Sequence, residues 1–210
     1  STENLGIDEL LMERIEGVHF GDLSEERKEF FLPKIAERLK ALHVETVVEG
    51  VFESIGITRT GDYADCFQDN IETLEFFARK FDYQEAINFL RNTRNQLLPL
   101  FTGTYRFGSK KFSLVHFDIS DGNTIISRKG PVFLDWGSAH LNDPAWDVSR
   151  AIVKLTGGSE RLVFTFLKSY GANDEMLRRV FAYLPLAYLS IAIGRSGKKE
   201  DLPRRASLRS

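Results

Sequence analysis

The stretch from Phe112 to Asp147 constrains the fold of this 210-residue chain more than any other part. Its short apolar runs, at 112–115, 124–127 and 132–134, are rich in Val, Ile and Phe, which is typical of β-strands. Between the last two runs, the segment 127–131 reads Ser-Arg-Lys-Gly-Pro, and Gly and Pro favour a turn. The sequence therefore predicts a β-hairpin formed by residues 124–127 and 132–135.

The expected hairpin brings two polar side chains together. A turn centred on residues 129–130 would pair Thr124 with Asp135 and place Asn123 beside Trp136. Paired strands lie about 4.8 Å apart. The amide oxygen of Asn123 and the carboxylate of Asp135 should therefore converge at the open end of the hairpin.

This pair of oxygen ligands suits a magnesium ion. Mg²⁺ usually takes one or two protein groups and completes its shell with water and phosphate oxygens. Asp118 lies on the loop leading into the hairpin, close enough to work beside such a metal. A metal that neutralises phosphate charge and a carboxylate that orients the nucleophile are what phosphoryl transfer requires.

The same residues carry a resemblance to a known family. His116-Phe117-Asp118 followed by Asn123 fits the H-x-D-x-x-x-x-N catalytic loop of kinase-like phosphotransferases, and Asp135-Trp136-Gly137 stands where these have D-F-G. The following segment 142–147, Asn-Asp-Pro-Ala-Trp-Asp, narrows the resemblance. The chain is similar to the aminoglycoside phosphotransferase and choline kinase-like family, which reads roughly H-G-D…N…D-W-G…D-P-x-x-D.

The resemblance implies a mainly α fold with a small β-hairpin, the C-terminal lobe of a protein kinase-like fold. Residues 10–17 resemble that family's hinge between lobes, and 39–43 its first large-lobe helix. We expect a hinge-like segment at 1–17, the lobe at 18–194 with a helical insertion at about 44–100, and a flexible basic tail at 195–210. No glycine-rich loop followed by a lysine-bearing strand is recognised. We therefore identify no cofactor-binding residue and expect a nucleotide-binding N-lobe upstream in the full-length chain.

Five residues receive roles from these patterns. Asp118 is the candidate catalytic base, although alone it would be interpreted as a capping residue in a turn. Asn123 and Asp135 are the candidate Mg²⁺ ligands; the alternative is that they serve only the turn and a bulge of the hairpin. In the resembled family the histidine at the place of His116 holds the catalytic loop. The resemblance also implies that Asp147 is a buried carboxylate bracing that loop through backbone N–H groups; the alternative is a solvated acid in the first turn of a helix.

Three neighbours receive plainer interpretations. Asp143 with Pro144 is typical of a helix start. His43 is expected to end a helix that begins at Asp22 or Ser24, a place where the helix dipole favours a histidine. Phe117 departs from the small glycine of the family and would narrow access to the catalytic aspartate.

These features predict a small-molecule phosphotransferase that uses Mg²⁺ and moves the γ-phosphate of ATP or GTP to a substrate hydroxyl. The isolated chain should be inactive without an N-lobe. The alternative is a non-catalytic kinase-like binding or regulatory module, which has no need of Asp118, Asn123 and Asp135 together. A metallohydrolase is disfavoured, because the remaining histidines show no metal-ligand spacing.

Composition limits the partners and the compartment. The net charge of −2 does not suggest a nucleic acid or an anionic membrane as partner. A single cysteine, Cys66, excludes an internal disulfide and fits a reducing compartment, so we expect a cytoplasmic protein. No apolar run is expected to span a membrane. Ser207 follows two arginines at the spacing of a basophilic kinase site, a pattern common by chance.

An acidic stretch in the expected insertion bears on the substrate. Asp62, Asp65 and Asp69 are followed by Glu72 and Glu75, and such carboxylates beside the catalytic aspartate would attract a cationic acceptor. The alternative is an ordinary solvated helix face. The 69/72 and 82/85 acidic pairs have the spacing of capping boxes, and Pro99 is expected to end the second of these helices.

Overall fold

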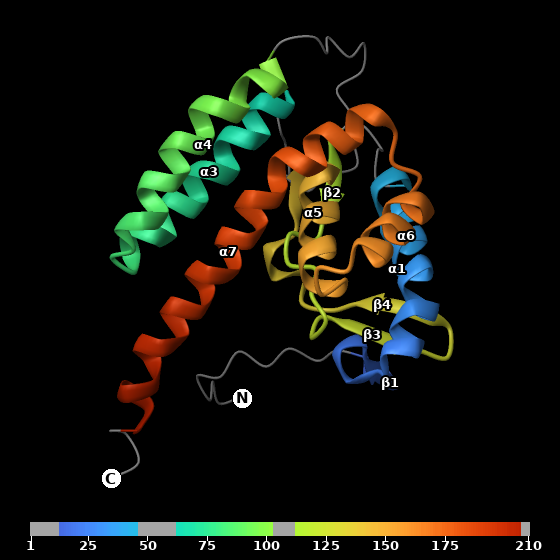
Figure 1. The fold of residues 1–210 in the computed structure, drawn as a ribbon. Helices are drawn as coiled ribbons and strands as arrows, with labels where there is room; N and C mark the ends of the chain where they lie inside the picture. Colours follow the sequence, from blue (N-terminus) through green and yellow to red (C-terminus); the bar gives the residue numbers. More distant parts are fainter. Residues whose placement is uncertain (1–12, 46–61, 103–111, 207–210) are drawn as a thin grey trace, which may run out of the picture.

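The chain folds into a mainly helical domain with two small antiparallel sheets (Figure 1). The computed structural model describes residues 13–45, 62–102 and 112–206. Most of the hinge-like segment 1–17 and Ser207 lie outside these ranges. The helices are α1 (Glu25–Glu45), α3 (Tyr63–Lys80), α4 (Gln84–Thr102), α5 (Pro144–Leu155), α6 (Glu160–Tyr170) and α7 (Asp174–Ala206). The mainly α architecture with a hairpin is confirmed.

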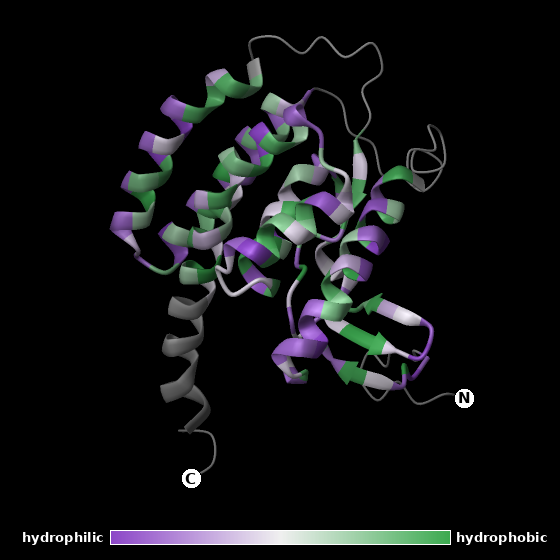
Figure 2. Ribbon diagram, turned by 45° about the vertical axis from the view of Figure 1, so that its right-hand side comes forward, coloured by the Kyte–Doolittle hydropathy of each residue, from purple (hydrophilic) through white to green (hydrophobic). Residues whose placement is uncertain are grey.

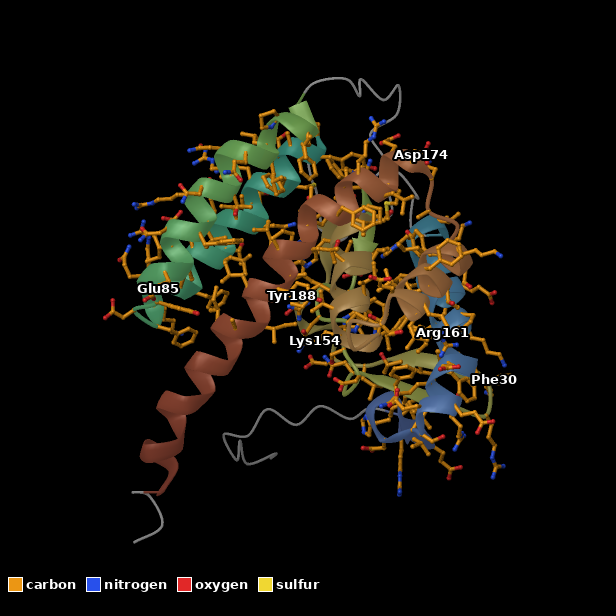
Figure 3. The ribbon with its side chains drawn as sticks, viewed as in Figure 1. Phe30, Glu85, Lys154, Arg161, Asp174 and Tyr188 are labelled. Carbon is orange, nitrogen blue, oxygen red and sulfur yellow. The ribbon has the colours of Figure 1, made fainter. Side chains whose placement is uncertain are left out.

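Helix α7 runs through the middle of the domain (Figure 1). The antiparallel pair α3 and α4 packs on one side of it, and α5 packs on the other. Helix α6 packs against α1 at the outer edge, where Figure 3 labels Arg161 of α6 and Phe30 of α1. Figure 2 shows hydrophobic and hydrophilic residues alternating along the helices, as expected for helices with one buried face. The largest fully buried side chains include Trp146, Tyr183, Phe67 and Phe166.

Two sheets carry the segment around the expected site. In the first, β3 (Thr124–Ser127) lies between β1 (Gly17–His19) and β4 (Gly130–Phe133). In the second, β2 (Ser113–Val115) pairs with β5 (His140–Asn142). A 3-10 helix (Trp136–Ser138) joins β4 to β5. The loop between β2 and β3 and the segment after β4 therefore lie between the two sheets.

Helix ends follow local chemistry in several places. Asp143 caps α5, with its side chain accepting a hydrogen bond from Ala145 N, and Pro144 occupies the first turn. Gly171 ends α6 in the left-handed conformation. Ser24 Oγ accepts from Arg27 N at the start of α1. The starts of α5 and α1 agree with the sequence analysis.

Three expectations about helix ends are wrong. The capping box of α3 uses Asp62 and Asp65, so the pair 69/72 lies inside the helix. The helix starts earlier because Ala64 and Phe67 already extend its buried face. Asp82 adopts φ 49° in the turn before α4 and does not cap it. Helix α4 also continues past Pro99 to Thr102, since a proline in the last turn disrupts little of the remaining helix.

The long C-terminal helix corrects the expectation about apolar runs. The segment Asp174–Gly194 of α7 is long and apolar enough to cross a membrane by length and composition, because it contains an 18-residue window with a mean hydropathy of 1.4. Val180, Tyr183 and Leu186 of this stretch are buried against the rest of the domain, and 39% of the apolar window is buried. Helix α7 extends through Ala206 into the 195–210 segment, whose expected flexibility stays a prediction.

Candidate active site

The β3–β4 hairpin sets the places of Asn123 and Asp135, but with a different register from the expected one. Thr124 pairs with Phe133, and Leu134 N donates to Asn123 O at 2.8 Å. The predicted pairing of Thr124 with Asp135 is wrong. The loop consists of residues 128–129, because Ser127 already pairs with the left-handed Gly130.

The register still leaves Asn123 near the catalytic loop. Asp135 directly follows Leu134, which is hydrogen-bonded to Asn123. The side chain of Asn123 turns towards Asp118, because its Nδ2 donates to Asp118 O at 3.0 Å and to Asp118 Oδ2 at 3.1 Å. The amide nitrogen is thereby fully used. The amide oxygen accepts no hydrogen bond from any described residue, so it is available to a ligand.

The carboxylate of Asp135 is also available to a ligand, and it is more exposed than the amide of Asn123. Its backbone is left-handed, with φ 61° and ψ 69°, a conformation that aspartate adopts more readily than most residues. Its carboxylate is exposed and makes no hydrogen bond or ion pair within the described ranges. The next residue is anchored, since Trp136 Nε1 donates to Phe133 O at 2.9 Å. A fixed backbone therefore presents an unpaired carboxylate.

These donors fit a magnesium ion. Asn123 and Asp135 offer hard oxygen atoms that have no partner among the described residues, and Mg²⁺ needs only one or two protein groups. Within residues 13–45, 62–102 and 112–206, no three His, Cys, Asp or Glu side chains cluster closely enough to hold a metal by themselves. The arrangement is therefore suited to a metal that shares its shell with water and phosphate.

His116 links the loop that carries Asp118 to the segment that carries Asp135. It is fully buried, its Nε2 lies 2.7 Å from Leu134 O, and Asp118 N lies 3.4 Å from its Nδ1. Both contacts are satisfied by one neutral tautomer, with Nε2–H donating and Nδ1 accepting. The ring also packs on Trp136, with centroids 4.6 Å apart. This geometry matches a holding role for the histidine.

Asp147 is buried and braces the catalytic loop. Its Oδ2 accepts from His116 N at 2.6 Å, and its Oδ1 accepts from Phe117 N at 2.8 Å. This is the geometry that the resemblance implied, and the solvated alternative does not fit it. His43 Nε2 lies 3.3 Å from Oδ2, and His43 Nδ1 lies 2.8 Å from the Tyr170 hydroxyl.

The role of His43 was missed from the sequence. The interpretation as a residue that ends α1 accounted for its place in the helix but not for its burial. The signal available was its position at the end of the family-like segment 39–43. Its partner Asp147 lies 104 residues further along the chain.

Phe117 stands where the resembled family has glycine, and its backbone explains that preference. Its φ is 68°, in the left-handed region that costs a non-glycine residue energy. Aromatic packing offsets this cost, because the ring lies between His140 at 4.6 Å and Trp146 at 5.1 Å. The ring is therefore part of the packing against α5 and β5.

Arg150 is a second residue that the sequence analysis missed. Its Nη2 lies 2.5 Å from Asp118 Oδ1, and its Nη1 donates to Ser190 Oγ on α7. The signal available was its place one turn after Asp147, among the buried apolar residues of α5.

Asp143 is closed in by the protein. It is fully buried, caps α5 and pairs with Arg179 Nε at 2.8 Å. Burial raises the pKa of its carboxyl, and the Arg179 charge opposes that rise. Its plain role as a helix cap agrees with the sequence analysis.

The acidic insertion residues are placed at α3 and engage local partners. Asp62 and Asp65 bond to each other's backbone at the start of α3, where Tyr63 packs on Phe112, the residue before β2. Asp118, by contrast, follows the end of β2. Glu75 pairs with Arg79. Asp69 is exposed along α3, and an acceptor-binding role for Asp62, Asp65 and Asp69 stays a prediction.

Comparison with known proteins gives a consistent picture. Residues 1–183 match the profile described as the phosphotransferase enzyme family. No curated protein matches the sequence significantly.

Solved structures with the same fold are kinases and antibiotic phosphotransferases. An ethanolamine kinase of Plasmodium vivax aligns with TM-score 0.60 and 15% identity over 88% of this chain and 57% of that one. The choline kinase of Streptococcus pneumoniae aligns with TM-score 0.56 and 20% identity over 85% and 59%. Aminoglycoside 2'-phosphotransferase-IIIa in its GDP complex aligns with TM-score 0.58 and 16% identity over 90% and 64%. The chain thus spans roughly three fifths of the length of these proteins.

Proposed function

Since the chain belongs to the phosphotransferase enzyme family, we propose that it carries the catalytic residues of a small-molecule kinase. The observation that carries this proposal is the grouping of Asp118, Asn123 and Asp135 with oxygen atoms left open to a ligand. The reaction is transfer of the γ-phosphate of ATP or GTP to a hydroxyl group. A non-catalytic module would need none of these three donors.

Each residue has a role in that reaction. Asp118 orients the acceptor hydroxyl and takes its proton as the oxygen–phosphorus bond forms and the bond to the nucleoside diphosphate breaks. Asn123 and Asp135 would hold Mg²⁺, which when bound neutralises charge on the phosphates. His116 and Asp147 fix the loop that presents Asp118, through the bonds already described.

The nucleotide needs groups that are not recognised in these 210 residues. We propose that a further lobe, of the kind that the longer relatives contain, supplies them. The chain alone should then bind nucleotide weakly and turn over nothing, because clamping of the phosphates carries most of this chemistry. Calorimetry with MgATP and MgGTP tests this, and tight binding or nucleotide hydrolysis by the chain alone would contradict it.

The acceptor is proposed to be a small hydroxyl compound. The similar structures include ethanolamine, choline and aminoglycoside kinases, whose names denote amines, so amino alcohols and aminated sugars come first in a substrate panel. Comparing rates at low and high salt tests the acidic insertion, because attraction of a cation by exposed acids weakens with salt. A cytoplasmic location, without nucleic-acid or membrane partners, remains a prediction from composition.

The decisive experiment uses the natural protein at its full length. Asp118→Asn should lower kcat by on the order of 10³-fold, since a positioned base and its orientation of the nucleophile are lost. Asp121→Asn is the matched control, because Asp121 is an exposed aspartate of the same loop. Equal kcat values for the Asp118→Asn variant and the wild type would refute the proposal.

A further inference from the structure

The carboxylate of Asp118 is held from two sides. Asn123 Nδ2 contacts Oδ2 at 3.1 Å, and Arg150 Nη2 contacts Oδ1 at 2.5 Å. The side chain of Asp118 is 44% exposed, whereas that of Arg150 is only 10% exposed. The guanidinium therefore approaches from inside the protein and leaves the outer side of the carboxylate open.

Arg150 is itself anchored by α7. Its Nη1 donates to Ser190 Oγ, and the Ser190 hydroxyl donates to Ala187 O at 2.7 Å. The hydroxyl proton is thus committed to the α7 backbone, and the oxygen lone pairs remain for Arg150. Tyr188, two residues before Ser190, is labelled on α7 in Figure 3. Three elements meet at one guanidinium: the catalytic loop, α5 and α7.

A buried arginine side chain is stable only if its positive charge is paired. Asp118 is the one carboxylate paired with Arg150 among the described residues, and Arg150 Nε is buried without a hydrogen-bond partner. Burying a cation costs several kcal/mol unless it is well paired. A packing role alone would be filled better by an apolar side chain, as are most of the other buried positions of α5.

We propose that Arg150 is a positioning residue of the phosphotransferase site, and that Ser190 of α7 holds Arg150 in place. The inference rests on the proposed function. Arg150 fixes the rotamer of Asp118, so that an open lone pair of its carboxylate faces the acceptor hydroxyl. In phosphoryl transfer, orientation of the nucleophile matters more than the strength of the base. Pairing the Asp118 carboxylate with Arg150 therefore costs little catalytic rate, although it weakens the base, and it aligns the carboxylate with the acceptor hydroxyl.

The proposal extends the site beyond the segment that matches the family. That match ends at residue 183, and Ser190 lies after it. The stretch of α7 around Ser190 thus becomes part of the apparatus that sets the turnover rate.

Kinetics of the full-length natural protein test the proposal. Arg150→Ala should lower kcat about 10²-fold, because a misplacement of about 1 Å costs that much. The KM for nucleotide should stay within about threefold, since Arg150 contacts neither candidate metal ligand. Arg150→Lys should recover only part of the loss, because one ammonium cannot copy the planar fork. Added guanidinium at sub-denaturing concentration should raise kcat of the Arg150→Ala variant.

Two matched controls separate positioning from packing. Ser190→Ala should lower kcat several-fold, whereas Ser149→Ala should not, although Ser149 Oγ also links α5 to α7 through Val180 O. Arg179→Lys, which alters another buried arginine–aspartate pair, should change the melting temperature but not kcat.

The outcomes also separate this proposal from the proposed function. If the wild type transfers no phosphate to any acceptor in the panel, both proposals fail. If the wild type is active and Asp118→Asn is inactive, but Arg150→Ala and Arg150→Lys keep wild-type kcat, the positioning role alone is overturned. The positioning role is also overturned if the apparent kcat of the Arg150 variants falls only in proportion to their folded fraction and added guanidinium does not raise it.

Discussion

Four of the aspartates between residues 112 and 147 fall into two pairs with opposite surroundings. Asp143 and Asp147 are fully buried, and their oxygens are used by backbone N–H groups, His43 and Arg179. Asp118 and Asp135 are partly or largely exposed, and their carboxylates keep capacity for a further partner. The buried pair shapes the loop, and the open pair is left for chemistry.

The difference shows that one short segment contains both aspartates that stabilise the structure and aspartates that can bind a ligand. A buried carboxylate without partners would be costly, so the protein satisfies Asp143 and Asp147 completely. An exposed carboxylate is solvated by water and can remain unpaired at little cost. Carboxylate oxygens that keep hydrogen-bonding capacity on a rigid backbone thus indicate a ligand site. Carboxylate oxygens that are fully hydrogen-bonded indicate a structural role.

The largest expected effect is at Asp135. Asp135→Asn should lower phosphoryl transfer by on the order of 10³-fold or more, because the metal loses its one charged protein ligand. Asparagine also tolerates the left-handed backbone, so the fold should be kept. Rates and melting curves of the full-length protein check both parts. If the Asp135→Asn variant transferred phosphate at the wild-type rate with Mg²⁺, the distinction between the buried and the exposed aspartates would be wrong.

The buried pair should respond in the opposite way. Asp147→Asn places an amide donor against the N–H groups of His116 or Phe117 or against His43. We expect a loss of roughly 3 kcal/mol in unfolding free energy, or a melting temperature lower by roughly 6–12 °C in a domain of this size. Asp174→Asn, at an exposed helix start, is the control. A melting temperature like that of the control would show that the bracing contributes nothing.

A smaller effect should appear in alkali. Burial raises the pKa of Tyr63 to about 12, the nearby Asp143 charge adds to the rise, and Arg179 opposes it. Between pH 10 and 12 the unfolded state releases this proton and the folded state keeps it, so stability falls as pH rises. The loss should be roughly 2–3 kcal/mol across that window.

Replacement of Tyr63 sharpens that test. Tyr63→Phe should make the fall in stability between pH 10 and 12 shallower by about that amount, as measured by denaturant unfolding at each pH; burial also raises the pKa of Tyr170, so part of the fall remains. Tyr188→Phe, at an exposed tyrosine of α7, should leave the fall as it is in the wild type. Identical pH profiles for the wild type and the Tyr63→Phe variant would contradict the assignment.

The sequence predicted the elements of the site better than their register. Local patterns located the strands of the hairpin and the Asp143 cap. The turn was misplaced because Arg128, Lys129 and Gly130 offer more than one two-residue loop.

Long-range pairs could not be derived from local patterns. His43 and Asp147 meet across 104 residues, and Arg150 reaches Asp118 across 32 and Ser190 across 40. No local periodicity encodes such contacts. The resemblance supplied the bracing by Asp147, because that role depends on the fold as a whole.

Metal binding tests the central claim most directly. Mn²⁺, an octahedral oxygen-seeking ion, can replace Mg²⁺ and be followed by electron paramagnetic resonance in the full-length protein with ADP. We expect Asp135→Asn to weaken Mn²⁺ binding by at least about tenfold, a loss of about 1.4 kcal/mol, while Asp121→Asn binds like the wild type. Equal Mn²⁺ affinity in the wild type and the Asp135→Asn variant would contradict the claim that the open oxygens of this hairpin form the metal site.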